Sequence, residues 1–225
     1  MSLGSKALLL GVISLPMWGA PLPCAQATLE DYIGLAEGCT VDSLLFSNFG
    51  FTENTATSNP GTNDILISPL LSTGPEVWTG IRIADVSGQF LLLGPQLNID
   101  FEITFTVSIT SPYSLYAASL LSDANATGSG NHARVREFVD YGSGEVQMQS
   151  NHSSNGPHIR EFPVTQSVEV TKIFSLDTGA QGGSSAISFV DQGFDYGLST
   201  QTPEPTTIIL AGCGLLAIGF CRRRS

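Results

Sequence analysis

The chain has 225 residues, with 20 acidic and nine basic side chains, and its formal net charge at neutral pH is −11. Residues 28–205 contain all 20 acidic residues and only five basic ones, so this segment alone carries a charge of −15. A surface of that sign repels nucleic acid and anionic lipid, which excludes both as partners of the segment. Its length suits a single domain that can bury a sizeable core.

The N-terminal end has the features of a leader for export. Lys6 supplies a positive charge, and residues 7–15 form a short apolar run. Ala25-Gln26-Ala27 then matches the A-x-A pattern at which signal peptidase cleaves. We therefore predict a signal peptide over residues 1–27, with Ala25 and Ala27 at its cleavage site and Thr28 as the first residue of the mature chain.

The four cysteines divide unevenly between the predicted parts. Cys24 falls inside the predicted leader, while Cys213 and Cys221 lie close to the C-terminus. Cys39 is then alone in the exported body, where it has no partner for an intramolecular bridge. We expect it to be a buried free thiol, with pairing to another chain as the alternative.

The clearest predicted element covers residues 98–110, where apolar and polar residues alternate without a miss. The apolar positions that we expect in the core are Ile99, Phe101, Ile103, Phe105 and Val107, with Ile109 following them. A period of two is typical of a strand with one buried face and one solvated face. Such a strand favours an antiparallel sheet.

Shorter apolar runs, separated by loops rich in Gly, Asn and Ser, fill the rest of the body. They cover residues 44–51, 65–71, 77–86, 90–93, 113–121, 135–139, 167–177 and 187–189. We expect residues 113–121 to pair with 98–110 as a hairpin across Ser111-Pro112, and residues 123–132 to form a polar loop. On residues 167–177 the apolar face carries one charged exception, Lys172. Short strands with frequent turns predict an all-β fold, an antiparallel β-sandwich or jelly roll.

A search for catalytic or metal-binding patterns finds none that is specific. The patterns H-E-x-x-H, C-x-x-C, G-x-S-x-G and the P-loop do not occur. His132, His152 and His158 lie in or beside predicted loops without a regular spacing, and we interpret them as surface histidines. Asp100 and Glu102 would stand about 7 Å apart on one strand face, a separation that carboxylate hydrolases use. That face is predicted to meet solvent, so we expect no catalytic residue, metal or cofactor in the body.

The C-terminal end joins three features without a gap. Pro203-Glu204-Pro205 is followed by residues 206–221, which carry no charge, and then by Arg222, Arg223 and Arg224. A helix of about 16 residues is roughly 24 Å long, somewhat short of a hydrocarbon core of about 30 Å. The large apolar side chains of this predicted transmembrane helix are Ile208, Ile209, Leu210, Leu215, Leu216, Ile218 and Phe220. The arginines favour the cytoplasmic side, which places the rest of the chain outside.

This arrangement resembles the PEP-CTERM sorting signal of bacterial surface proteins over residues 203–224. The resemblance implies that an exosortase recognises Pro203, Glu204 and Pro205, while residues 222–224 stop further export. The body is similar to exported PEP-CTERM proteins of unknown activity, through residues 38–41, 46–49, 170–173 and 187–189. The implied organisation is a signal peptide (residues 1–27), a β-sandwich body (residues 28–200) and a sorting tail (residues 201–225).

Two classes of function remain open for the body. The first is a non-catalytic surface or matrix protein, exported, anchored in the membrane by its tail and then delivered to the cell surface or extracellular matrix. Signal peptidase and an exosortase would be its processing partners. The second is a carbohydrate-binding module or a glycan-active hydrolase, with extracellular polysaccharide as its partner. Trp78 lies in a predicted strand, where we expect it to pack in the core, and a cluster of exposed aromatic side chains would favour the second class.

Overall fold

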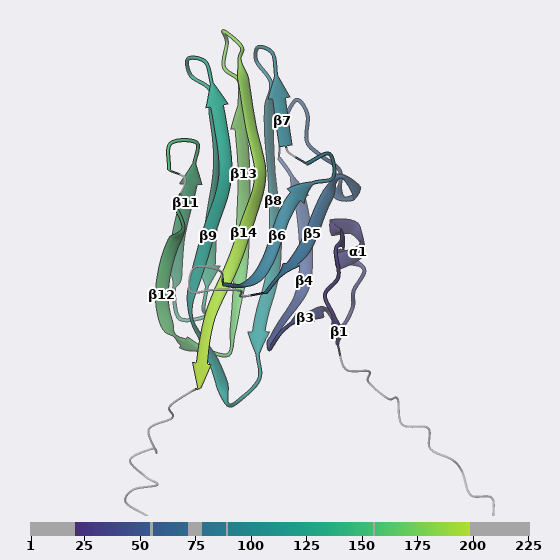
Figure 1. Cartoon of the computed structure of the whole chain (residues 1–225), viewed down its shortest axis with the longest axis vertical. Coiled ribbons are helices and arrows are strands. Elements are labelled where there is room, and N and C mark those ends of the chain that lie inside the picture. Colours follow the sequence, from purple (N-terminus) through teal and green to yellow (C-terminus); the bar gives the residue numbers. More distant parts are fainter. Residues whose placement is uncertain (1–20, 55, 72–77, 89, 155, 199–225) are drawn as a thin grey trace, which may run out of the picture.

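The computed structural model describes residues 21–54, 56–71, 78–88, 90–154 and 156–198. These residues form two β-sheets packed face to face, with a short helix beside them (Figure 1). Neighbouring strands are antiparallel, apart from one short parallel pair near the N-terminal end. The predicted all-β sandwich is therefore confirmed.

The order of strands shows which elements lie in each layer. The first sheet contains β1 (Leu22–Pro23), β3 (Cys39–Val41), β4 (Leu44–Glu53), β8 (Asn98–Ile109), β13 (Ser167–Asp177), β10 (His132–Asp140) and β11 (Glu145–Asn151), in this order. The second contains β12 (His158–Thr165), β9 (Tyr113–Thr127), β14 (Ser184–Leu198), β6 (Thr79–Asp85), β5 (Ile65–Leu70) and β2 (Ala27–Thr28), with β7 (Phe90–Leu93) paired to β14. The helical elements are α1 (Leu29–Ile33) and a 3₁₀ turn, η1 (Thr62–Asp64).

Strand β8 lies in the middle of the first sheet, between β4 and β13. Its buried side chains are the predicted ones, Ile99, Phe101, Ile103, Phe105 and Val107. Phe101 stacks on Phe174 of β13 with the ring centroids 4.5 Å apart, and Phe90 of β7 packs on both rings from the second sheet. Each fully buried side chain of this size contributes about 1.5–3 kcal/mol, so the inward face of β8 contributes a large share of the stability of the core.

Strand β9 is not the hairpin partner of β8 that the sequence predicted. After Ser111-Pro112 the chain passes from the first sheet to the second, where β9 pairs with β12 and β14. Both edges of β8 are already occupied, by β4 and β13. A strand has only two edges, so β9 takes its place in the opposite layer, where Leu115 and Leu120 pack into the core.

The loop predicted over residues 123–132 is wrong in its first half. Strand β9 continues to Thr127, and Ala124 is buried opposite Ile187 of β14. Residues 122–127 are all small or polar, so the sequence of this part of the strand shows no run of large apolar residues at alternate positions. Ser122 is buried as well, and its hydroxyl donates to the Ser150 hydroxyl of β11 at 2.7 Å, which joins the two sheets and satisfies both polar groups.

Within the described ranges, no helix has the length and hydropathy needed to cross a membrane. The predicted C-terminal helix, residues 206–221, lies outside the residues that the structure describes, as do residues 1–20 of the predicted signal peptide.

Candidate functional site

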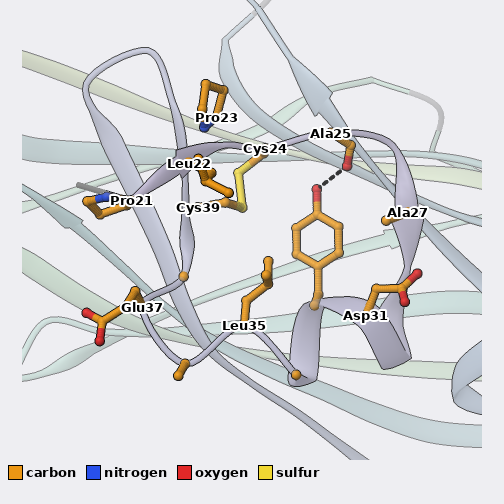
Figure 2. Close-up of a pocket in the computed structure, with 14 residues that line it drawn as sticks. Pro21, Leu22, Pro23, Cys24, Ala25, Ala27, Asp31, Leu35, Glu37 and Cys39 are labelled. Atoms are coloured by element: carbon orange, nitrogen blue, oxygen red, sulfur yellow. Dashed lines mark hydrogen bonds between the residues drawn. A yellow bond between two sulfur atoms is a disulfide. The ribbon is translucent and has the colours of Figure 1, made fainter. Parts of the chain in front are cut away.

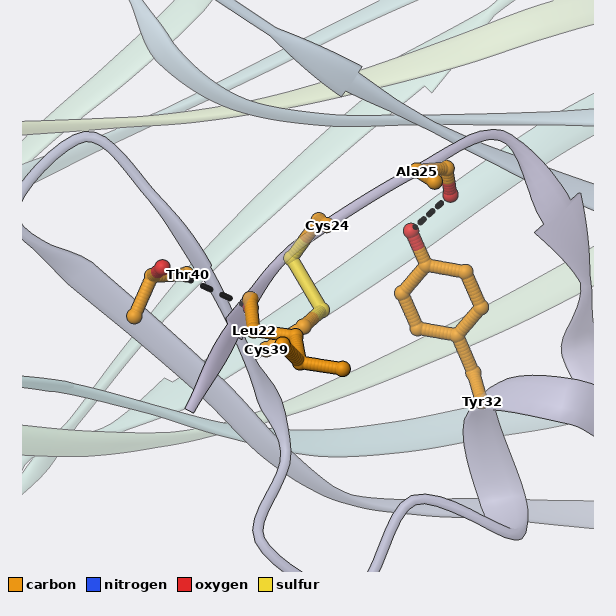
Figure 3. The surroundings of a disulfide bond; sticks show 6 residues. All are labelled: Leu22, Cys24, Ala25, Tyr32, Cys39 and Thr40. Carbon is orange, nitrogen blue, oxygen red and sulfur yellow. Dashed lines mark hydrogen bonds between the residues drawn. A yellow bond between two sulfur atoms is a disulfide. The ribbon is translucent and has the colours of Figure 1, made fainter. Parts of the chain in front are cut away.

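Residues 21–41 fold back on themselves as a loop closed by a disulfide, and we call this segment the N-terminal clasp. Strand β1 pairs in parallel with β3, which places Leu22 opposite Cys39. The Cys24 amide donates to the carbonyl oxygen of Thr40 at 2.8 Å. Cys24 and Cys39 form a disulfide with their Cα atoms 4.9 Å apart (Figure 3). The disulfide therefore closes the clasp by joining the residue after β1 covalently to β3.

This disulfide shows that the expectation of a lone thiol at Cys39 was wrong. The sequence assigned Cys24 to the leader because the A-x-A pattern lies downstream of it, whereas the structure places Cys24 beside β3. Cys39 is buried, as predicted, but as one half of an intramolecular bridge. Disulfides persist in the oxidising space outside the cytoplasm, so the bridge agrees with an exported chain.

Helix α1 fills the loop of the clasp. Thr28 caps it through a reciprocal pair of bonds: the Asp31 amide donates to the Thr28 hydroxyl at 3.3 Å, and the Thr28 amide donates to the Asp31 carboxylate at 3.1 Å. Tyr32 is buried against Phe49, with 5.0 Å between ring centroids, and its hydroxyl donates to the Ala25 carbonyl oxygen at 2.7 Å. Burial raises the pKa of Tyr32 to about 12, so the hydroxyl keeps its proton and this bond at physiological pH.

Both residues of the predicted cleavage site are part of this clasp. Ala25 accepts the hydrogen bond from Tyr32. Ala27 lies in β2, opposite Ile67 of β5. The structure thus places Ala25 and Ala27 in contact with the folded body, on the segment between the disulfide and α1.

The clasp surrounds a pocket of about 500 Å³, lined entirely by residues of the clasp (Figure 2). Leu22, Leu35 and the ring of Tyr32 contribute apolar walls. The carboxylates of Asp31 and Glu37 point away from its centre, and the Tyr32 hydroxyl is engaged by Ala25. The pocket can therefore hold an apolar group.

A separate site, which is polar and buried from solvent, lies inside the sandwich. Glu137 of β10 and Lys172 of β13 are opposite each other in register, and the lysine ammonium donates to Glu137 Oε2. Both side chains are 0% exposed. Gln192 of β14 approaches Glu137 from the second sheet. Glu137 Oε1 and Gln192 Oε1 have no hydrogen-bond partner within the described part of the chain.

Burial moves the pKa values of this pair in opposite directions. Loss of solvent raises the pKa of Glu137, and the attraction and hydrogen bond of Lys172 oppose this rise. Loss of solvent also lowers the pKa of Lys172, against the attraction of Glu137. Neither residue lines the pocket in the clasp. We therefore interpret the pair as a structural one that links β10 to β13 within the core.

The three predicted surface histidines do not converge on a metal site. His132 begins β10 and shares a hydrogen bond of 3.3 Å with Ser175, whereas His158 begins β12 and shares one of 3.1 Å with Ser154. His152 follows β11 in a turn. In the part of the chain that the structure describes, no group of three or more His, Cys, Asp and Glu side chains could hold a metal ion.

The outward faces carry the remaining candidate residues. Asp100 and Glu102 alternate with the buried residues of β8, on its outer face as predicted. Trp78 does not lie within a strand in the core: it precedes β6 and is half-buried, so close to Gly193 of β14 that a Cβ there would meet Trp78 Cβ at 2.3 Å. Among aromatic side chains of the described residues, Tyr113 is the one large exposed ring, at 38%. The clustered aromatic face that sugar stacking would need is not seen in these ranges.

The predicted sorting residues Pro203, Glu204 and Pro205, the apolar span and residues 222–224 all lie outside the described ranges. The structure does place the two ends of the body. Strand β1 and the C-terminal end of β14 lie toward the same end of the sandwich (Figure 1). The chain therefore enters and leaves the body at that end.

Comparison with known proteins identifies the tail. Residues 201–224 match the family model of the PEP-CTERM protein-sorting motif, which confirms the resemblance predicted from the sequence. No curated protein matches the chain.

Solved structures give weaker likenesses. TmCBM61 in complex with β-1,4-galactotriose has a TM-score of 0.34 at 12% identity, over 66% of this chain and 90% of that one. The family 11 carbohydrate-binding module from Clostridium thermocellum, in complex with a β-1,3-1,4-mixed-linked tetrasaccharide, has a TM-score of 0.22 at 10% identity, over 77% and 96% of the two chains. At these TM-scores neither likeness carries an argument about what this chain binds.

Proposed function

We propose that this chain is an exported bacterial surface or extracellular-matrix protein with a non-catalytic body, delivered by its C-terminal sorting tail. The observation that carries the proposal is the match of residues 201–224 to the PEP-CTERM protein-sorting motif. The motif accounts for the order of features at this end of the sequence, which are a Pro-Glu-Pro triplet, an uncharged apolar run and an arginine cluster.

Each part of the two ends has a role in this proposal. Signal peptidase removes the leader, and an exosortase recognises Pro203-Glu204-Pro205. The prolines keep the backbone around Glu204 extended, so a processing enzyme can reach it. Residues 206–221 hold the chain in the membrane, while residues 222–224 stay on the cytoplasmic side. The body is first anchored to the membrane and is then released or transferred to the cell surface or matrix.

The features of the described body are compatible with this proposal. The pocket of the clasp has no described nucleophile or acid directed into it, and the Glu137–Lys172 pair is shut away from solvent. A carbohydrate-binding or glycan-hydrolysing body would present several exposed rings or a facing pair of carboxylates, and the described surface offers Tyr113 as its one large exposed ring. The Cys24–Cys39 disulfide suits a protein that works in an oxidising space.

Expression with and without an exosortase is expected to change the C-terminus of the protein. Without the enzyme, we expect the protein to remain membrane-bound and to retain residues 222–225. With it, we expect the surface-held or released form to lack these residues. Mass spectrometry of the C-terminal peptide measures the difference. Retention of residues 222–225 in both strains would refute sorting by cleavage and leave only the membrane anchor.

Two variants separate recognition from anchoring. Alanine in place of Pro203, Glu204 and Pro205 is expected to block the exosortase-dependent cleavage while the protein stays in the membrane, because the apolar run is untouched. Glutamine at residues 222–224 is expected to weaken retention at the cytoplasmic face, since it removes the charges that fix the orientation of the helix. Normal cleavage of the triplet variant would show that the enzyme recognises another feature of the tail.

A further inference from the structure

We propose that residues 21–27 are kept in the exported protein, so that the leader is removed upstream of Pro21 and the Cys24–Cys39 disulfide belongs to the mature body. The inference rests on the proposed export of the chain. It differs from the cleavage after Ala27 that the A-x-A pattern predicts, and it assigns a different mature N-terminus.

The segment from β1 to β2 holds the two sheets together along one side of the sandwich. Strand β1 is the last strand of the first sheet, beyond β3, and β2 is the last strand of the second, beyond β5. Because β1 and β2 are consecutive, the few residues between them cross from one sheet to the other. Unpaired strand edges are sites of unwanted pairing, and this segment covers part of the edges of both β3 and β5.

The contacts within this crossing are those of a folded segment. The Cys24 amide donates to the Thr40 carbonyl oxygen at 2.8 Å, and the disulfide fixes the same residue to β3. One residue later, the Ala25 carbonyl oxygen accepts the Tyr32 hydroxyl at 2.7 Å. The residues between β1 and β2 are therefore bonded to β3 through Cys24 and to α1 through Ala25.

Cleavage after Ala27 would remove β1, half of β2 and Cys24 together. Cys39 would be left as a buried thiol, and the Tyr32 hydroxyl would lose its acceptor in a place where the side chain is buried. The edges of β3 and β5 would lose their cover, and part of the wall of the pocket would go with them. Every one of these losses is avoided when the cut falls before Pro21.

The sequence provides small residues for such an upstream cut. Gly19 and Ala20 come directly before Pro21, after the apolar run of residues 7–15. The A-x-A-like pattern has a small residue immediately before the cut and another two residues earlier; Ala20 meets the first requirement, whereas Trp18 occupies the other position, so the fold and not the motif favours this cut. Ala25-Gln26-Ala27 is the competing site. The two sites give mature chains that differ in whether Cys24 is present.

The N-terminus of the exported protein distinguishes the two sites. We expect the full chain, exported by a bacterial host, to begin upstream of Cys24. Digestion at glutamate without reductant is expected to give two peptides joined by a disulfide, because Glu30 and Glu37 lie between the two cysteines. An N-terminus at Thr28 with a free Cys39 thiol would overturn the inference and leave export intact. A chain that still begins at Met1 would instead overturn the proposed export by a cleaved leader.

Two kinds of variant test the same point without relying on that digestion. Ala27→Val places a β-branched residue, the type that strands favour, in β2, but it removes the small residue that cleavage after residue 27 requires. We expect this variant to have the wild-type N-terminus, and accumulation of an uncut precursor would contradict the inference.

Cys24→Ser provides the second variant, because it can alter the mature body only if Cys24 is retained. We expect proteolysis of the exported Cys24→Ser body to be at least about tenfold faster than that of the wild type. Cys39→Ser should have a similar effect, and the double variant should add nothing further, because one bridge is lost in every case. A Cys24→Ser body that is identical to the wild type in mass and in proteolysis rate would show that residue 24 is removed during export.

Discussion

Phe105→Asp is expected to unfold the body, whereas Thr104→Asp is expected to leave it folded. Phe105 is buried in β8, where its ring stacks on Phe49 with 5.4 Å between centroids and contacts Phe46 at 6.1 Å. Removing the ring costs about 3–5 kcal/mol, and placing a carboxylate in the space adds the cost of burying a charge. The sum is comparable to the whole stability of a typical domain, about 5–15 kcal/mol.

Thr104 is the matched control, one residue away on the outer face of the same strand. A carboxylate there stays in contact with solvent and meets the moderate repulsion of Glu102 along the strand and of Glu169 diagonally across on β13, which we expect to cost about 1 kcal/mol. Urea denaturation of the two purified variants measures the contrast. Equal losses of stability at the two positions would show that the inward and outward faces of β8 had been assigned wrongly.

Lys172→Met is expected to destabilise the body by about 3–5 kcal/mol, because it leaves Glu137 as an unpaired carboxylate in the core. Adding Glu137→Leu to this variant should recover most of the lost stability, since an apolar pair of similar volume carries no desolvation cost. Apolar replacements of buried ion pairs are often neutral or more stable by about 1–4 kcal/mol. Unfolding free energies of the two single variants and the double variant give the coupling between the residues. A double variant that loses the sum of both single effects would contradict the proposed pairing.

The pH dependence of Lys172→Met provides a second readout for the same pair. Burial already raises the pKa of Glu137 in the folded body, and removing the lysine removes the attraction that opposes this shift. A carboxyl whose pKa is raised by folding binds a proton more tightly in the folded state than in the unfolded state. Its contribution to the free energy of unfolding is therefore most favourable below the unfolded pKa, about 4.3, and is lost as the pH rises through the folded pKa. We therefore expect the stability deficit of Lys172→Met relative to the double variant to shrink as the pH falls from about 7 towards 5. A deficit that does not change with pH would mean that Glu137 is solvated in the variant.

The strands of this body were largely predictable, but their neighbours were not. Residues 98–110 and 167–177 alternate clearly, and the structure has β8 and β13 there. Alternation identifies the buried face of a strand and says nothing of which strand lies beside it. For that reason β9 was predicted to pair with β8, although both edges of β8 are occupied by other strands.

The buried ion pair had a signal in the sequence that was only half recognised. Lys172 stands out in the sequence as a charged residue on an apolar face, and Glu137 lies in the same way at the inward position between Val135 and Val139. Two opposite charges at inward positions on two strands are what a buried pair requires. The register that places Glu137 opposite Lys172 could come only from the structure.

The N-terminal clasp was missed for a different reason. A short motif, Ala25-Gln26-Ala27, fixed the predicted boundary and thereby removed Cys24 from consideration as the partner of Cys39. The pairing depends on β1 lying beside β3, and β1 has only two residues, too few for any periodic pattern. A second cysteine close to a predicted cleavage site of an exported chain is the signal that could have raised the alternative.

The intact mass of the protein, recovered from the cell surface or medium of a strain that contains an exosortase, reports on both ends of the mature chain at once. We expect a body that has lost its leader upstream of Pro21, has lost residues 222–225, and contains Cys24 and Cys39 in a disulfide. Recovery of the protein with residues 222–225 still attached, at the same level as in a strain without the enzyme, would contradict the central claim that the tail is a processed sorting signal.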